Sequence, residues 1–260
     1  MSKLIWFSIV FCFLFDSALA VTDESINFQP GINLYQNSPE LKDLFGTHGS
    51  QLCGPIAVTH AFNFLKYKRT PSFPNFDLDE SYDDQIRYFF STCKTDRETG
   101  TNYLSVVACM QEFMSDSGYT PWTQIVGPHA QEAPFKTPLT INHIRTYINA
   151  RAAVIMRVGW YKLNPVSGIY ERTGGHYYNV YGYDYNLSWK QDQVILKAVN
   201  SLVDYSNRKT DQMFDDVTMS KIKDTEKYPA SVAYTLSGVG FNYVNYKTVA
   251  EDIFVMLPKL

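Results

Sequence analysis

The sequence predicts an α+β fold in which a helical half packs against an antiparallel β-sheet half. Apolar residues recur at helical spacing before residue 150, whereas strand-like runs rich in valine, isoleucine and tyrosine follow from residue 153. Helices first and strands afterwards are typical of α+β domains. A Cys-Gly-Pro turn at Cys53 opens an apolar helical segment, so we expect this helix to organise the helical half.

The first residues have the pattern of a secretory signal. Lys3 supplies the positive charge, residues 4–15 are apolar, and Ala18-Leu19-Ala20 is a small-residue cleavage site. The apolar run is too short to span a bilayer. We therefore expect residues 1–20 to be removed and the protein to be secreted or periplasmic.

Residues 21–260 have the length of one domain with a sizeable core. The first part of this domain, residues 21–49, is expected to be an N-terminal arm. The arm holds one short helical segment, at 39–45. The formal net charge is −3 and no basic run occurs. This balance argues against nucleic acid or an anionic membrane as the main partner.

Helices and strands are expected in separate parts of the chain. After the Cys53 helix, helical spacing predicts helices over 79–93, 102–117 and 141–150, and the Pro-broken segment 119–138 is expected to be a long connection. Strands are predicted over 153–161, 168–172, 177–183, 193–199, 231–236, 239–246 and 252–257.

Three of the four cysteines lie beyond the signal, namely Cys53, Cys93 and Cys109. An odd number in an oxidising compartment indicates one pair plus a free thiol. Cys93 and Cys109 are the obvious pair, and closing a loop of that size stabilises a fold by about 3 kcal/mol in the chain-entropy model. Two buried free thiols are the alternative, because a symmetric helical hairpin would place them out of register.

Cys53 stands where a nucleophile is easily activated. If a helix begins at Cys53, its unpaired first-turn N–H groups and the helix dipole lower the pKa of a thiol there. Pro55 supports that start, because proline is tolerated in the first helical turn. The alternative is a buried cysteine with a packing role only.

A cysteine nucleophile needs a base and a group that orients the base. His176 follows Gly174-Gly175, and glycines let a backbone pass close to another segment, so its imidazole can meet the helix start. The next run, VILKAVNS, is expected to pair antiparallel with the His176 strand and to bring Asn200 to the imidazole N–H. His60 lies two helical turns from Cys53 and is too distant. Two weaker candidates for the orienting group are Asp184 and Asp204.

The three segments together resemble the papain-like cysteine peptidases, and among them the bacteriocin-leader-peptidase-like and staphopain-like bacterial groups. The likeness lies in CGP before an apolar helix, GGH before a strand that ends in GYD, and an Asn-Ser pair after the following strand. It implies a papain-like fold, a peptide or protein substrate, a monomer, and no metal or organic cofactor. Cys53 would form an acyl-enzyme, His176 would hold the thiolate as an ion pair and then protonate the leaving amine, and Asn200 would orient His176.

The resemblance also implies an oxyanion site formed by the Cys53 backbone N–H and a side-chain donor. Such families carry a glutamine six residues before the nucleophile, where this sequence has Thr47. We assign the donor role to Gln51, two residues before Cys53, with His48 or another group as alternatives. Two other functions stay open: transglutaminase-like acyl transfer, and binding by a protein whose Cys53 is inert.

Overall fold

The computed structural model describes residues 35–46, 51–69, 81–131, 135–184, 192–203, 214–223, 226–238 and 245–259. The predicted signal at 1–20, most of the arm, and Thr47, His48 and Asp204 lie outside these ranges. In chain order the elements are α1 (Pro39–Phe45), α2 (Cys53–Arg69), α3 (Tyr82–Thr92), α4 (Tyr103–Asp116), β1 (Thr120–Val126), α5 (Ile141–Asn149), β2 (Ala153–Leu163), β3 (Tyr170–Asp184), β4 (Gln193–Val199), β5 (Asp215–Lys221), β6 (Tyr234–Gly238) and β7 (Lys247–Lys259).

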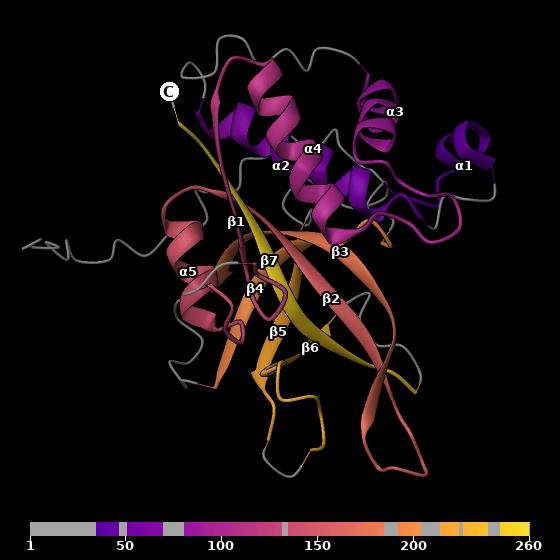
Figure 1. Cartoon of the computed structure of the whole chain (residues 1–260), viewed down its shortest axis with the longest axis vertical. Coiled ribbons are helices and arrows are strands. Elements are labelled where there is room, and N and C mark those ends of the chain that lie inside the picture. The colour runs from indigo at the N-terminus through magenta and orange to yellow at the C-terminus, as the bar shows by residue number, and fades with distance from the viewer. Residues whose placement is uncertain are drawn as a thin grey trace, which may run out of the picture.

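The strands form a closed antiparallel barrel. Their order is β1-β7-β2-β3-β4-β5-β6, and β6 also pairs with β7, so that β2 to β7 close on themselves and β1 is an extra strand beside β7. Figure 1 shows α1 to α4 gathered at one end of this barrel and α5 against its side. The predicted papain-like arrangement, a helical half packed against a sheet half, is therefore wrong.

The long strand β7 makes the closure possible. Residues 248–250 at its start pair with β6, whereas residues 253–259 pair with β1. Its register with β2 shifts between Arg157 and Val158, so that Glu251 is an extra residue between the two partners Asp252 and Ala250. Such bulges bend a strand and increase its twist, and the bend lies where β7 changes from one neighbour to the other.

Several predicted elements are confirmed. The short helix at 39–45, the helix start at Cys53 and the strand at 193–199 occur where the pattern placed them. The predicted strands at 168–172 and 177–183 are one continuous strand, β3. Strands β1 and β5 were not predicted, and β1 lies within the supposed connection 119–138. Most of the predicted strand 239–246 falls outside the described residues.

Two apolar cores result from this arrangement. One fills the barrel with side chains of β2 to β7 and includes Ile144 of α5, and the other lies between α1 to α4 and the outer face of β2, β3 and β7. Helix α2 is central to the second core, where Phe62 stacks on Phe89 at 5.3 Å between ring centroids. The Asn179 side-chain amide of β3 donates to the Ala57 carbonyl of α2 at 2.9 Å, which fixes the helix against the strand.

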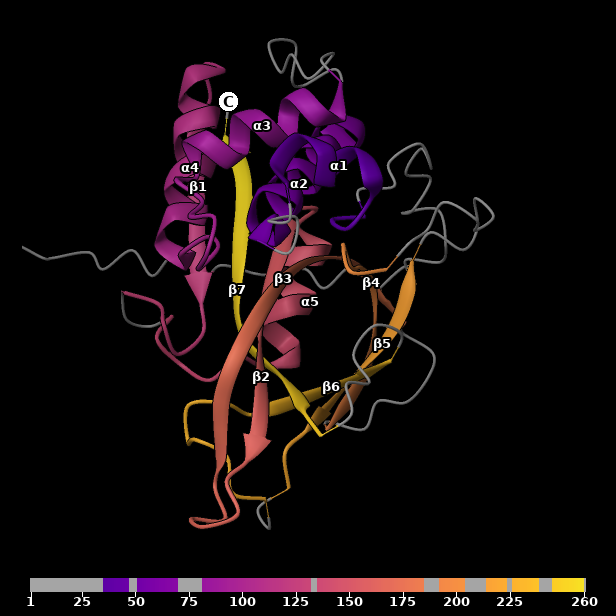
Figure 2. The same ribbon diagram turned by 90° about the vertical axis from the view of Figure 1, so that its right-hand side faces the viewer.

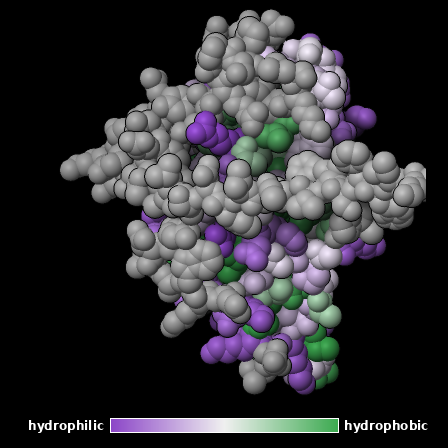
Figure 3. All heavy atoms as spheres, turned by 90° about the vertical axis from the view of Figure 1, so that its left-hand side faces the viewer, coloured by the Kyte–Doolittle hydropathy of each residue, from purple (hydrophilic) through white to green (hydrophobic). Residues whose placement is uncertain are grey.

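The β2–β3 hairpin extends away from the helical end, as Figure 2 shows. Near its tip Val166 is 94% exposed. On the face drawn in Figure 3, hydrophilic and hydrophobic residues are interspersed over the part of the surface that the structure describes. Among the helices within the described ranges, none is long and apolar enough to cross a membrane.

Candidate active site

The candidate site lies where β4 stops and leaves one edge of β3 open. Strand β2 pairs with β3 along residues 170–180, but β4 pairs with its other edge only from Asn179 onward. At Tyr177 that edge is occupied by the start of α2, because the Tyr177 backbone N–H is directed at Cys53 Sγ. The topology therefore places the Cys53 sulfur at the backbone of Tyr177, the residue that follows His176 in the chain.

His176 and Asn200 are joined as predicted. His176 Nε2 lies 2.9 Å from Asn200 Oδ1, and both side chains are buried. The Leu202 backbone N–H donates to the same Oδ1 at 3.0 Å, which fixes the orientation of the amide. Because a carbonyl oxygen only accepts, this contact selects the Nε2–H tautomer and leaves the lone pair on Nδ1.

The paired glycines before His176 make room on the two faces of β3. A Cβ at Gly174 would lie 2.9 Å from the ring of Trp160, which stacks on the His176 imidazole at 6.2 Å and an interplanar angle of 10°. A Cβ at Gly175 would collide with the Arg172 guanidinium. The sequence predicted close approach at these glycines, and the groups that approach are Trp160 and Arg172.

Burial dominates the protonation of Cys53 and His176. Three backbone N–H groups, those of Tyr177, Gly54 and Cys53, lower the pKa of the Cys53 thiol, but desolvation outweighs them and raises it to about 11. Desolvation lowers the pKa of His176 to about 4, against the smaller effect of its bond to Asn200. The expected thiolate–imidazolium pair is therefore not the resting state, because both buried groups are neutral at pH 7.

The described contacts of these two residues agree with a neutral pair. In the part of the chain that the structure describes, no hydrogen bond joins the Cys53 thiol to the His176 imidazole. Catalytic hydrogen bonds are often long without substrate and shorten in the reacting complex. The Cys53 sulfur lies at the backbone of Tyr177, the residue that follows His176 in β3.

Gln51 contacts a loop. Its Nε2 donates to the Glu98 carbonyl at 2.9 Å, and its Oε1 lies 2.9 Å from where a Cβ at Gly100 would stand. Gly100 has a positive φ of 83°, a conformation that glycine adopts without strain. The Gln51 amide therefore holds the loop at 96–100 in place.

A second glutamine, which sequence reasoning missed, contacts Ser201, the residue after Asn200. Gln36 is 2% exposed, its backbone N–H donates to the Ser201 carbonyl at 2.9 Å, and its Oε1 accepts from Ser201 Oγ at 2.8 Å. With Oε1 held by Ser201, the Nε2 end of the amide is the donor end. Gln36 precedes Cys53 by 17 residues, with α1 between them, so the expected spacing of six could not find it. The only signal in the sequence is a glutamine that ends the apolar run INLYQ ahead of CGP.

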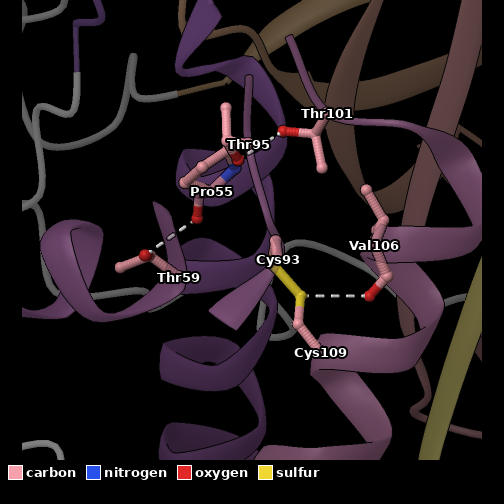
Figure 4. Close-up of a disulfide and its surroundings, with 7 residues drawn as sticks. All are labelled: Pro55, Thr59, Cys93, Thr95, Thr101, Val106 and Cys109. Carbon is pink, nitrogen blue, oxygen red and sulfur yellow. Dashed lines mark hydrogen bonds between the residues drawn. A yellow bond between two sulfur atoms is a disulfide. The ribbon is translucent and has the colours of Figure 1, made fainter. Parts of the chain in front are cut away.

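A disulfide closes the loop that packs on the Cys53 turn. Cys93 at the end of α3 is bonded to Cys109 of α4, as Figure 4 shows, and Cys53 is the free cysteine among the described residues. The predicted pairing is confirmed, and the alternative of two free thiols is wrong. Within the loop, Thr101 lies so close to Gly54 that a Cβ there would collide with it.

The same loop also contacts β3. The Tyr177 hydroxyl donates to the Thr101 carbonyl at 3.0 Å, and the Thr95 and Thr101 hydroxyls lie 2.7 Å apart. Thr101 therefore touches both the helix that carries Cys53 and the strand that carries His176. The disulfide, the loop and the site form one connected unit.

A charged cluster with buried carboxylates continues along the same face of the sheet. Its members lie on β2, β3, β7 and the loop after β1: Arg157, Arg172, Glu251, Asp252 and His129. Asp252 is fully buried, and burial raises its pKa although Arg157 opposes the shift. Within the described ranges, no group of three or more histidine, cysteine or acidic side chains is arranged to hold a metal ion.

Comparison of the chain with protein-family models found no match, and comparison with curated proteins found no similar sequence. The assignment of a function consequently depends on the geometry of the site.

Proposed function

We propose that the chain is an exported cysteine peptidase that hydrolyses peptide bonds through an acyl-enzyme on Cys53. One observation carries the proposal. The 2.9 Å contact between His176 Nε2 and Asn200 Oδ1 lies next to a strand edge whose Tyr177 N–H is directed at the only described free thiol. A nucleophile, a base and an orienting amide in this order are the components of a catalytic triad.

The neutral resting state suggests how acylation proceeds. His176 Nδ1 takes the Cys53 proton as Sγ bonds to the substrate carbonyl carbon, so thiolate and imidazolium form only during attack. Asn200 Oδ1 accepts from Nε2–H throughout and stabilises the imidazolium. The imidazolium then donates its Nδ1 proton to the leaving nitrogen as the C–N bond breaks. His176 Nδ1 next takes a proton from a water molecule as its oxygen bonds to the thioester carbonyl carbon. The C–S bond then breaks, the acid leaves, and Nδ1 returns the proton to Cys53 Sγ.

The oxyanion needs donors at the start of α2. We assign them to the Cys53 backbone N–H, which begins the helix, and to the amide of Gln36, whose Oε1 is held by Ser201, the residue after Asn200. Gln51, whose Nε2 is bonded to Glu98, is thereby replaced in this role.

Export is part of the proposal. The signal-like pattern at 1–20 supports it, and so does the Cys93–Cys109 disulfide, because disulfides persist in oxidising compartments and are rare in the cytosol. The substrate is therefore expected to be a peptide or protein outside the cytoplasm.

The decisive experiment compares the wild type with Cys53→Ala on a mixture of peptides, with products read by mass spectrometry. We expect cleavage by the wild type only, while Cys53→Ala keeps the cooperative unfolding transition. Cleavage by Cys53→Ala would exclude the proposal. A primary amine added to the wild-type reaction tests acyl transfer, since hydrolysis alone leaves no amine adduct. Absence of any turnover would favour a binding protein.

A further inference from the structure

The two faces of β3 beside the sulfur differ in character. His176 and the Trp160 ring that stacks on it lie on one face, where the missing side chain of Gly174 makes room. On the opposite face, that of Gly175 and Tyr177, lies the guanidinium of Arg172. Successive residues of a strand point to opposite faces, but the register of β3 with β2 shifts between Gly174 and Arg172, so that Thr173 is an extra residue. Because of this shift, the Arg172 guanidinium lies over Gly175, on the face opposite to His176.

A pair of facing glycines makes room for Arg172. Gly159 of β2 is in register with Gly175 of β3. A Cβ at Gly159 would lie 2.4 Å from Glu251 Oε1, and a Cβ at Gly175 would collide with Arg172 Nη2. Any larger residue at either position would displace the ion pair between Arg172 and Glu251, so the hollow is shaped for these two groups.

In this ion pair the cation is exposed and the anion is buried. Arg172 donates through Nε to Glu251 Oε1 at 2.7 Å and through Nη2 to Oε2 at 3.2 Å, which uses two of its five N–H donors. The Arg172 side chain is 44% exposed, whereas that of Glu251 is 1% exposed. Glu251 also accepts a hydrogen bond from the Tyr161 hydroxyl at 2.9 Å, and it forms an ion pair with Arg157, whose Nε lies 3.1 Å from Oε2. A molecule that lies along this face therefore meets guanidinium N–H groups and not the carboxylate.

The distance from the sulfur suits a substrate side chain. The guanidinium lies over Gly175, two residues along β3 from the N–H that is directed at Cys53 Sγ. Two residues of a strand span about 7 Å. An extended peptide that runs beside β3 advances by the same length over two of its own residues. In the proposed reaction His176 protonates the leaving amine, so the substrate residues after the scissile bond lie toward the His176 face. The residues before the scissile bond then lie toward Arg172.

We propose that Arg172, set in the hollow of Gly159 and Gly175, selects substrates with an acidic side chain on the second residue before the scissile bond. This inference rests on the proposed peptidase function and names its substrate class. Carboxylate and guanidinium form charge-assisted hydrogen bonds that a neutral amide of the same shape does not match.

The test uses two chloromethyl ketones, acetyl-Leu-Glu-Gly-CH2Cl and acetyl-Leu-Gln-Gly-CH2Cl, with iodoacetamide as a small uncharged probe. Each chloromethyl ketone alkylates Cys53 with loss of chloride and of the thiol proton, and iodoacetamide does so with loss of iodide. Mass spectrometry follows the rate of each reaction. In the wild type we expect the glutamate probe to react at least about threefold faster than its glutamine isostere, with a preference that salt reduces. Arg172→Gln should bring the ratio to about one, whereas Arg172→Lys should retain part of it.

Lys162→Gln is the matched control, because it removes a cation from the neighbouring pair of the same hairpin, where Lys162 is in register with Glu171. It should leave the ratio unchanged, and the iodoacetamide rate should be the same in all four proteins. An unchanged ratio in Arg172→Gln, or equal rates for both probes in the wild type, would overturn the inference while the peptidase function stands. Glutamate-selective labelling without turnover of the corresponding peptides would refute the peptidase function alone. A Cys53 inert to all three reagents would refute both.

Discussion

At the scale of single residues, the site depends on amide side chains as much as on the nucleophile. Asn200 accepts from His176 and from the Leu202 backbone, and Ser201, the next residue, holds Gln36. Two consecutive residues after β4 thus position the base and the donor we assign to the oxyanion. Small changes here should affect catalysis more than folding.

Asn200→Ala is expected to lower kcat/KM by roughly tenfold or more. The substitution removes the acceptor that fixes the Nε2–H tautomer, and it leaves a buried imidazole N–H without that bond, at a cost to stability of about 1 to 3 kcal/mol. Kinetics at pH 7 and urea unfolding measure the two effects separately. Wild-type kcat/KM in this variant would contradict the orienting role.

Gln36→Ala and Gln51→Ala form a matched pair, each removing one buried or half-buried amide. Loss of one oxyanion donor typically costs about 100- to 1,000-fold in kcat. We expect that loss in Gln36→Ala, with little change in KM, and a much smaller effect in Gln51→Ala, whose amide holds the loop at Glu98. The reverse ranking would return the donor role to Gln51.

The sequence was sufficient to find Cys53, His176 and Asn200, because each follows or opens an element whose pattern is clear. It was insufficient for Gln36, since only the folded chain brings that residue to Ser201. Nor did the sequence indicate the protonation states of Cys53 and His176, because burial is a property of the packed core and not of a helix start. Residue identity and order predicted which side chains meet, and packing determined their pKa values.

At the scale of elements, local patterns predicted well and non-local pairing did not. The start of α2 at Cys53 and the bounds of α1 and β4 follow from periodicity and capping. Strand β1 was missed because Pro121 and several polar residues look like a connection, and its pairing with β7 joins segments more than a hundred residues apart. Barrel closure was missed for the same reason, since it depends on the bend of β7 at Glu251.

Removing the disulfide should affect the site as well as the fold. Cys93→Ala combined with Cys109→Ala is expected to cost about 3 kcal/mol of unfolding free energy, from the loss of a short closed loop. Because the loop contacts Gly54 and Tyr177 through Thr101, kcat should fall as well under conditions where the variant is folded. Urea unfolding and peptide kinetics provide the two measurements. Full kcat in the folded variant would show that the loop does not position Cys53.

At the scale of the whole molecule, buried histidines are expected to limit stability in acid. Burial lowers the pKa of His60 and of His176 to about 4, below the 6.5 of an exposed imidazole. Between these values the unfolded chain binds protons that the folded chain does not, so stability falls as pH falls from about 6.5 to 4. Each histidine accounts for roughly 3 kcal/mol over that range. Asp252, with its raised pKa, opposes the trend.

Urea unfolding at several pH values between 7 and 4 checks this expectation. His60→Gln should remove about half of the pH dependence, while it leaves the catalytic base in place. A stability that is constant over this range would show that the two imidazoles are hydrated in solution.

The outer edge of β1 has a consequence for how copies of this protein behave together. Closure of the barrel leaves β1 as the one described strand with a neighbour on one side only. An unpaired edge invites strand-to-strand association between molecules, and prolines and polar side chains discourage it. Strand β1 carries Pro121 in register with Pro258 of β7, together with polar residues in its middle. These side chains are expected to discourage such association, and replacing Pro121 with valine should promote concentration-dependent aggregation while the protein stays folded.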